Sequence, residues 1–391
     1  MRKGVRLRFI HTADWHLGRL FHGGHLTDDQ AHVLDQLVDL CRDAKPDALL
    51  VAGDVYDRAV PPPEAVGLLD DVLSRLVLDL EIPVVMIAGN HDSPGRLHFG
   101  ARLLAGRRLY VSGQFVSQCE PIVFHDAHGP VHVYALPYAE PSTVRCSLAS
   151  DAVVDHDSAM RAIVSGIRAA HPAGVRSILV AHAFVAGGQG CESERPLSVG
   201  GAGTVDVSCF AGFDYVALGH LHRPQIISAN GTGAVRYSGS LLKYSFDESD
   251  QTKSVTVVEM DAGGVCRCEA VGFSPRREVR RISGLMVDLL KPPLEADGKD
   301  DYLEVTLLDQ GPVLDAVGRL RDVYPNVLLL ERVKQKLDES AEAARLDHRK
   351  VTDLELFRAF YRYVTAKELL SPQEMAFAGV VEEMRRKERS A

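Results

Sequence analysis

The hexapeptide HTADWH spans residues 11–16 and follows directly on an apolar-leaning stretch at residues 7–10. Together they predict a strand that ends on a carboxylate and an imidazole, Asp14 and His16. Side chains two residues apart in an extended segment point the same way, so both groups aim at one spot. A carboxylate beside an imidazole is a ligand pair suited to a metal. Taken alone, the hexapeptide fits a surface Asp and a core His equally well, and the other strands of the chain have to decide.

Length and composition describe an ordinary globular chain. At 391 residues it is long enough for two or three domains, with 46% hydrophobic and 25% charged residues. The longest apolar runs, ALLVAG and VVMIAG, are far too short to span a bilayer. The N-terminus leads straight into the first predicted strand without a signal-peptide pattern. We therefore expect a cytoplasmic protein with no membrane segment.

The spacing of the cysteines and the net charge exclude two classes of protein, those with a cysteine zinc site and those that coat DNA. The seven cysteines form no CxxC pair, and Cys266 and Cys268 flank a single residue in a predicted strand. This usage indicates reduced thiols rather than a zinc site. A net charge of −9 excludes a generally basic, DNA-coating protein. If the chain handles nucleic acid, local patches, metal ions or a partner must offset the repulsion.

Strand-like and helix-like segments alternate along the first half of the chain. Apolar residues recur at helical spacing over residues 29–44 and 64–80. Continuous apolar runs, typical of strands buried on both faces, occupy residues 47–54, 83–90, 177–183 and 214–220. The pattern predicts an α/β fold.

Every one of these predicted strands ends on polar side chains that can bind metal. They are Asp14 and His16, then Asp54, then Asn90, then His182, and finally His220 and His222. The carboxyl ends of strands are where ligands bind in open α/β sheets. Glycines at 53, 89 and 219 precede the polar group in three cases, and we expect them to let the backbone turn and to leave room for an ion. Because buried polar groups are costly unless paired or metal-bound, the pattern predicts a metal site.

The number of ligands indicates two ions. A single octahedral ion would leave some of the seven side chains unused, whereas two ions sharing Asp54 would use them all. Oxygen and nitrogen ligands without sulfur favour manganese, iron or zinc over calcium. Two metals roughly 3.5–4 Å apart can activate water and hold a phosphate for in-line attack.

Five short motifs carry a family resemblance. DWH, GDVYD, GNHD, HAF and GHLH, in this order, resemble the signatures of the calcineurin-like metallophosphoesterases. The resemblance is closer still to the SbcD nucleases, and it covers roughly residues 5–275. It rests on the longer stretches HTADWHLGR, PVVMIAGNHDS, YVALGHLHRPQ and YSGSLLKYSFDE. The SbcD nucleases are the bacterial counterparts of the eukaryotic double-strand-break repair nuclease. The resemblance implies a two-sheet αββα core, a small α+β capping domain and C-terminal helices. This sequence lacks the proline that the family usually has near Leu241 or Leu242, so we expect that loop, close to the metal face, to differ in geometry.

The resemblance also implies a role for each ligand. Two divalent ions are expected, with Mn²⁺ favoured. Asp54 would bridge them. One ion would be held by Asp14, His16 and His222, and the other by Asn90, His182 and His220.

Other polar residues near the motifs receive roles outside the ligand set. His91 would protonate or stabilise the leaving oxygen as a general acid. Asp92 would orient His91, or else be a turn-forming residue. Asp57 is expected to be a loop group beyond the ligands, and His11 to be buried against the sheet. A further set, either DNA-phosphate contacts or solvated loop residues, comprises Arg19, His22, His25 and Arg96.

Beyond about residue 275 the pattern changes. Strands are predicted at 277–290, 301–309 and 326–333, with a polar loop at 291–300 and a helix at 312–323. This unit resembles the capping domain that guides DNA in the family. We therefore divide the chain into a nuclease domain (1–275), a capping domain (276–336), a charged linker (337–350) and a helical segment (351–391).

The helical segment carries two start signals and two apolar stripes. TDLE at 352–355 and SPQE at 371–374 both predict capping boxes. The stripes consist of Leu356, Phe357, Phe360, Tyr361 and Val364, and of Phe377, Val380, Val381 and Met384. They are compatible with an ordinary helical hairpin, but we favour a helix-in-groove partner contact. The family resemblance implies that this partner is the coiled coil of the SMC-like ATPase SbcC. It also implies a homodimer, for which residues 62–80 are a candidate surface.

The sequence thus predicts a metal-dependent DNA nuclease subunit acting with an SMC-like ATPase in repair and recombination. The family implies 3′→5′ exonuclease action on duplex ends and endonuclease cutting of hairpins and single strands. The alternative is a metallophosphodiesterase acting on a small nucleotide or another phosphodiester, which would need neither capping domain nor partner helices. A non-enzymatic scaffold on the same fold is disfavoured, because all seven ligands are present.

Overall fold

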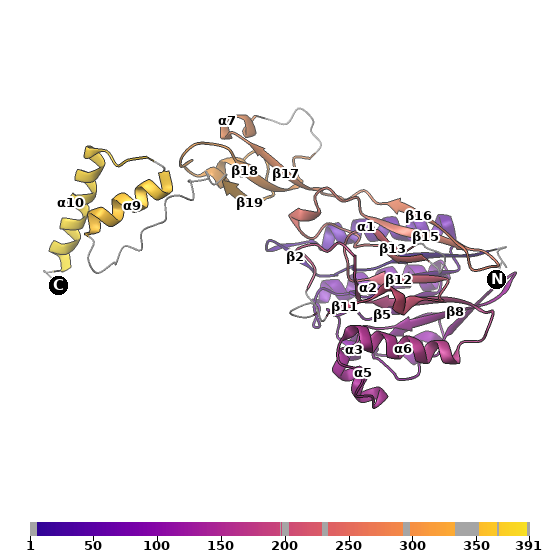
Figure 1. Cartoon of the computed structure of the whole chain (residues 1–391). Helices are drawn as coiled ribbons and strands as arrows, with labels where there is room; N and C mark the ends of the chain where they lie inside the picture. Colours follow the sequence, from indigo (N-terminus) through magenta and orange to yellow (C-terminus); the bar gives the residue numbers. More distant parts are fainter. Residues whose placement is uncertain are drawn as a thin grey trace. The chain divides into compact units, whose positions relative to one another are not determined.

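The computed structural model describes residues 6–195, 197, 203–228, 234–291, 298–332, 352–365 and 367–388 (Figure 1). The chain divides into two compact units, Met1–Arg280 and Arg281–Ala391. The linker predicted at 337–350 lies outside the described residues.

Two six-stranded sheets form the first unit. The first has the order β16-β15-β1-β4-β5-β6, and the second β13-β14-β12-β9-β8-β7. The strands of the first sheet are β1 (Leu7–Thr12), β4 (Ala48–Val51), β5 (Val84–Ile87), β6 (Leu109–Ser112), β15 (Ser254–Met260) and β16 (Cys266–Gly272). Those of the second are β7 (Ile122–Asp126), β8 (Gly129–Leu136), β9 (Arg176–His182), β12 (Tyr215–Gly219), β13 (Gln225–Ser228) and β14 (Ala234–Tyr237).

The strands that carry the predicted ligands are parallel neighbours. In the first sheet β1 pairs with β4 and β4 with β5, and in the second β9 pairs with β12, all in parallel register. Parallel strands point their carboxyl ends to one edge of the sheet, so the residues that follow them are brought together. The antiparallel strands β15 and β7 lie outside this parallel set.

One apolar core joins the two sheets, and helices cover their outer faces. The inter-sheet core includes Phe9, Leu50 and Val85 of the first sheet and Val180 and Ala217 of the second. A second core packs the other face of the second sheet against α6 (His156–Ala170), as part of a cluster that also contains Val144 of α5 (Pro141–Leu148). Two further helices, α1 (Thr27–Ala44) and α2 (Pro63–Ser74), bury apolar stripes and begin close to the predicted bounds. The predicted αββα fold is confirmed.

Short elements complete the first unit. They are β2 (Leu20–Phe21), β3 (Gly24–His25), the π-helical turn Arg75–Asp79, α3 (Pro94–Leu97), α4 (Ala101–Ala105), β10 (Phe184–Val185), β11 (Thr204–Val205) and the 3₁₀ turns Val207–Phe210 and Phe246–Glu248. All seven cysteines are free thiols, and Cys266 and Cys268 lie in β16 as predicted.

The second unit contains a small sheet of β17 (Val279–Gly284), β18 (Tyr302–Leu307) and β19 (Val327–Arg332). β18 and β19 are parallel and are connected through α8 (Ala316–Arg321), which confirms the predicted βαβ unit. The strand predicted over 277–290 is wrong in its second half. There α7 (Met286–Leu289) forms, because the Asp309 carboxylate accepts the Met286 N–H and Met286 turns into the core. The predicted helix at 312–323 is shorter than expected, and residues 292–297 of the predicted loop lie outside the described residues.

Two helices, α9 (Asp353–Thr365) and α10 (Ser371–Glu388), end the described chain. The TDLE capping box is present, since Thr352 and Glu355 exchange side-chain-to-backbone hydrogen bonds. The SPQE box is wrong by one residue: the Gln373 side chain accepts from the Leu370 N–H, and the Leu370 carbonyl receives the first helical N–H groups. Over the described part of the chain, no helix combines the length and the apolar character needed to cross a membrane.

Candidate metal centre

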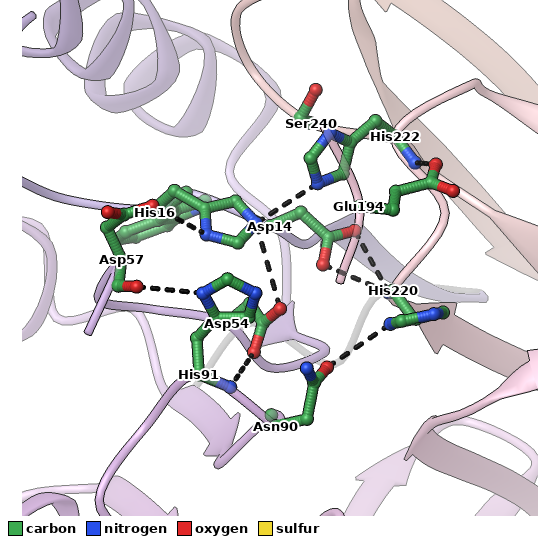
Figure 2. A network of polar contacts seen from close by, with 12 residues as sticks. Asp14, His16, Asp54, Asp57, Asn90, His91, Glu194, His220, His222 and Ser240 are labelled. Carbon is green, nitrogen blue, oxygen red and sulfur yellow. Dashed lines mark hydrogen bonds and ion pairs between the residues drawn. The ribbon is translucent and has the colours of Figure 1, made fainter. Parts of the chain in front are cut away.

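Polar residues that follow five strands lie together in one buried cluster, part of which Figure 2 shows. β1, β4 and β5 deliver residues from the first sheet, and β9 and β12 from the second. Six of the seven predicted ligands are buried and Asn90 is half-buried. The cluster therefore lies where the carboxyl edges of both sheets meet, as predicted.

The backbone at four of the ligands adopts a conformation that L-residues rarely occupy. The φ angles are 53° at Asp14, 45° at His16, 49° at Asp54 and 109° at His220. Such conformations cost on the order of 1–3 kcal/mol each and persist where the surroundings enforce them. Here the Asp14 and His16 N–H groups donate to the carbonyls of Gly53 and Asp54, which holds the β1 and β4 turns together.

The three glycines before the ligands are closely surrounded, and Gly53 turns the backbone as predicted, with a φ of 91°. A Cβ at Gly89 would lie 2.1 Å from Asp54 Oδ1, and one at Gly219 would lie 1.9 Å from the Ala52 carbonyl oxygen. A Cβ at Gly53, whose φ is 91°, would lie 2.5 Å from His182 Nδ1. The glycines thus make room for the ligand side chains and the adjoining strand, while the space that they leave for an ion stays a prediction.

Asp14, His16 and His222 form the first ligand group. One ligand atom from each lies within 4.8 Å of the others, and all three residues are buried. His16 Nε2 and His222 Nε2 face each other at 3.1 Å. The Asp14 carboxylate accepts the backbone N–H of His220, which ties this group to the end of β12.

Asp54, His182 and His220 form the second group, with Asn90 between the two imidazoles. Asn90 Oδ1 lies 2.9 Å from His182 Nε2 and 3.2 Å from His220 Nδ1. Asp54 Oδ2 lies 3.5 Å from His182 Nε2 and 3.7 Å from His16 Nε2, between the two groups. Its other oxygen accepts the His91 N–H at 2.9 Å, so the carboxylate is held in a position suited to a bridge.

Protonation states in the cluster favour metal binding. Burial lowers the pKa of His16, His182, His220 and His222, so the imidazoles are neutral and keep a lone pair for an ion. Burial, and next the charge of Asp54, raise the pKa of Asp14 well above its usual value. Two carboxylates crowded into a buried site are destabilising without a cation. The donor set therefore fits two divalent ions sharing Asp54.

The structure contradicts the role predicted for Asp92. Its carboxylate is buried and accepts the backbone N–H groups of Val55, Tyr56 and Gly89. It therefore joins the turns after β4 and β5, which is closer to the alternative of a turn-forming residue. Burial raises the pKa of Asp92 to about 7.

The His91 ring contacts Asp57 rather than Asp92. His91 Nδ1 lies 2.7 Å from the backbone carbonyl oxygen of Asp57, which orients the imidazole (Figure 2). Asp57, His91 and His16 form a third group of possible ligands within 4.8 Å. The Asp57 carboxylate accepts from Arg19 Nη1 at 3.1 Å and only 14% of the Arg19 side chain is exposed, so Arg19 is not a solvated loop residue. A contact between Arg19 and DNA phosphate stays a prediction. Asp57 lies in the loop after β4, as the sequence predicted, and its expected place beyond the ligands stays a prediction because it belongs to this third group.

Other predicted residues lie as follows. His11 is fully buried against the second sheet, with its ring nitrogens 3.0 Å from Tyr215 Oη and 3.1 Å from the Leu218 carbonyl oxygen. Burial lowers its pKa to about 3. The loop at 237–248 is close to the ligands, since the Tyr244 ring lies 5.4 Å from that of His16. His22, His25 and Arg96 are exposed.

Sequence reasoning missed Ser193 and Glu194 at this site and gave no role to Glu248, which ends the stretch YSGSLLKYSFDE. Glu194 Oε1 accepts the His222 N–H at 2.7 Å, and burial raises the pKa of Glu194 to about 7. Ser193 Oγ contacts both His222 Nδ1 and the buried Glu248. Ser193 and Glu194 lie in the loop between β10 and β11, where no motif marks them.

Comparison with known proteins places this geometry in a family. Residues 7–224 match the calcineurin-like phosphoesterases, and residues 275–365 match the SbcD C-terminal domain, described as the type 5 capsule protein repressor C-terminal domain. Among solved structures, the protein TT1561 of Thermus thermophilus is similar at 13% identity and a TM-score of 0.40, covering 68% of this chain and 99% of that one. A dimetal phosphatase from Danio rerio is similar at 12% identity and a TM-score of 0.39, with the same coverage.

The first match spans more than half of the chain and contains all seven predicted ligands. The second begins where the small sheet begins and reaches the end of α9. The chain belongs to the calcineurin-like phosphoesterases, and its C-terminal match makes it an SbcD-type member of that family.

Proposed function

We propose that this chain is a DNA nuclease that depends on two divalent ions, with Mn²⁺ favoured. The observation that carries the proposal is the position of Asp54 Oδ2 between two buried ligand groups, with His91 on the loop that also supplies Asn90. Mixed oxygen and nitrogen donors without sulfur suit manganese. Metal identity, DNA as substrate and the role of each residue are parts of this proposal.

The residues of the chain divide the work of phosphodiester cleavage. Two bound ions would withdraw charge from the phosphate and activate water for in-line attack. Asp54 would hold both ions at a fixed separation. His91 would protonate the leaving 3′ oxygen; because its Nδ1 is hydrogen-bonded to the Asp57 carbonyl, Nε2 is the nitrogen left to face the substrate.

DNA is preferred to a small phosphodiester because of the second unit. The small sheet β17–β18–β19 with α8 has its own apolar core and falls within the SbcD-type match. A small-nucleotide phosphodiesterase has no use for such a domain. We propose that it guides duplex ends and hairpins, so that the chain acts as a 3′→5′ exonuclease and a hairpin endonuclease in repair and recombination.

Exposed apolar side chains support two proposed protein–protein contacts of this chain. Phe360, Val364 and Val380 of α9 and α10 are each more than half exposed. We propose that the 351–391 segment binds an SbcC-type SMC-like ATPase. Val66 and Leu78 are exposed within residues 62–80, and we propose this region for homodimer contacts, which would give a heterotetramer with the ATPase.

The test is a cleavage assay with Mn²⁺ on three substrates: hairpin DNA, a blunt duplex, and a small chromogenic phosphodiester. The assay is run with and without an SbcC-type ATPase and ATP. We expect Mn²⁺-dependent cutting of both DNA substrates and ATP stimulation on duplex ends. Hydrolysis of the small ester without cutting of either DNA would instead identify a small-molecule phosphodiesterase.

A further inference from the structure

Three residues outside the ligand set join the rings of the metal centre. They are Arg19, Asp57 and Ser193, here called the outer clamp. We infer that the outer clamp sets the orientation and tautomer of His16 and His222, and so prepares one of the two metal subsites. This inference rests on the proposed two-metal function.

His222 is oriented by a hydrogen bond whose direction the structure assigns. Ser193 Oγ lies 2.6 Å from His222 Nδ1 and 2.5 Å from Glu248 Oε1. A hydroxyl has one proton, and an ionised carboxylate can only accept. Lys253 Nζ also donates to Glu248, which keeps this buried carboxylate ionised. Ser193 therefore donates to Glu248 and accepts from His222 Nδ1–H, so the lone pair of His222 is on Nε2.

His16 faces the clamp through an unpartnered atom. His16 Nδ1 is buried and makes no hydrogen bond, while Asp57 Oδ1 lies 3.6 Å from it (Figure 2). This gap is longer than a hydrogen bond, as is often found at sites that tighten only when loaded. A carboxylate at this position favours a proton on Nδ1 and leaves the Nε2 lone pair for an ion. The two Nε2 atoms, 3.1 Å apart, would then both be donors to the same metal.

Arg19 ties the two contacts together. Its Nη1 donates to Asp57 Oδ1 at 3.1 Å and its Nη2 donates to the Ser193 carbonyl at 2.9 Å. Its guanidinium carbon lies 5.0 Å from the centre of the Tyr244 ring, and only 14% of the side chain is exposed. One rigid guanidinium thus spans the groups beside both imidazoles. The Asp57 carbonyl in addition holds His91.

The second subsite is built differently. His182 Nδ1 lies 2.9 Å from the Ala52 carbonyl oxygen, a backbone atom of the turn after β4, so no clamp side chain orients this ring. Removing a clamp side chain should therefore weaken one ion and leave the other. Loss of an outer partner of a metal-bound histidine typically costs about 10–100-fold in metal affinity.

The experiment titrates the metal-free full-length protein with Mn²⁺ by calorimetry and follows the spin-coupled Mn²⁺ pair by electron paramagnetic resonance. The variants are Asp57→Asn and Ser193→Ala, with Ser193→Thr to restore the hydroxyl. The matched control is Asp39→Asn, which removes a carboxylate from an exposed ion pair with Arg42 on α1. We expect the wild type, the control and Ser193→Thr to bind two ions. Asp57→Asn and Ser193→Ala should keep one, bind the second about 10–100-fold more weakly and lose the coupled signal at limiting Mn²⁺.

Two results would overturn the clamp. One is wild-type affinity for both ions in Asp57→Asn and Ser193→Ala. The other is an equal loss at both subsites together with a lower melting temperature of the metal-free protein, which would mean that these residues support the loops rather than the rings. Fewer than two ions in the wild type would instead refute the proposed two-metal function. That result differs from failure of the clamp, in which the wild type still binds two ions.

Discussion

The metal centre and the C-terminal helices are both exceptions to the rule that polar side chains are exposed and large apolar ones buried. The metal centre buries polar groups, whereas the helices expose apolar ones. In the first, Asp14, Asp54 and four imidazoles are buried. In the second, Phe360, Val364 and Val380 are exposed. Buried charge and exposed large apolar groups are both unfavourable in isolation. The buried groups of the first region fit cations, and the exposed apolar groups of the second support the partner contact proposed above.

The two regions also differ in how firmly their side chains are held. In the metal centre nearly every ligand has a second contact, such as Asp54 with the His91 N–H and His182 with the Ala52 carbonyl. In the helical pair, the Phe357 and Phe377 rings stack at 3.9 Å, while Phe360 projects from α9 into solvent. The side chains of the first region are held in place for small ions, whereas the second region leaves large apolar side chains exposed on both helices.

The largest effect is expected from Asp54→Ala. Because Asp54 Oδ2 lies between both ligand groups, this change should remove the bridge and reduce Mn²⁺ binding below two ions. Cleavage should fall further than the roughly 10²–10⁴-fold that a general acid contributes. Anomalous scattering from Mn²⁺-soaked crystals measures the occupancy, with Asp39→Asn as the control. A wild-type map with one ion or none would refute the bridged pair.

His91→Ala should separate catalysis from metal binding. His91 lies beside the ligands but is not needed to complete either group, and its ring is held by the Asp57 carbonyl. We expect both ions to stay bound and turnover to fall by roughly 10²–10⁴-fold. Metal stoichiometry and single-turnover cleavage are measured on the same preparation. Loss of an ion in this variant would make His91 a ligand, in agreement with its grouping with His16 and Asp57.

Removal of the chain after about residue 345 tests the second region as a whole. We expect a folded, metal-binding nuclease that cuts short single-stranded or nicked substrates with Mn²⁺, because the first unit has its own cores. ATP-stimulated cutting of duplex ends and co-purification with the ATPase should both vanish. Aggregation or loss of metal would show that the helices belong to the core, and continued co-purification would locate the contact elsewhere.

A pair of single substitutions sharpens the same test. Phe360 is 60% exposed, so Phe360→Ala should leave the helices intact and weaken ATPase binding by about 2 kcal/mol or more, the size of an interface hot spot. Phe357→Ala, in contrast, removes the stack with Phe377 and should lower helicity even without the partner. Binding is measured by calorimetry and helix protection by hydrogen exchange. Equal binding losses with equal loss of protection would contradict a direct contact at Phe360.

The smallest effect is expected from Thr352→Ala. Thr352 and Glu355 form the capping box at the start of α9, and loss of such a cap costs about 0.5–2 kcal/mol of helix stability. Hydrogen exchange should become faster in the first turn of α9 and remain unchanged in α6, whose own box at Asp155 is intact. Metal binding should be unaffected. Unchanged exchange in α9 would mean that the cap adds nothing measurable there.

Sequence patterns alone predicted the fold of the first unit and the meeting of its polar strand-end residues. Apolar runs such as residues 47–54 marked the parallel strands, and the polar residues after them met at one edge because parallel strands share a direction. Motif order identified the family before any contact was known. The ends of elements were predicted less well where a sequence fits both a strand and a helix. β17 stops at Gly284 because an Asp309 contact favours a helical turn at Met286.

The groups that orient the predicted ligands become visible only in the folded chain. Arg19 and Ser193 are 174 residues apart in sequence and meet only because the two sheets face each other. Because of the same packing, the Asp92 carboxylate accepts three backbone N–H groups, and His91 Nδ1 contacts the Asp57 carbonyl. The sequence had led us to expect a contact between His91 and Asp92. Hydrogen bonds depend on where a side chain points within a few tenths of an ångström, and residue type and spacing do not specify this between distant loops.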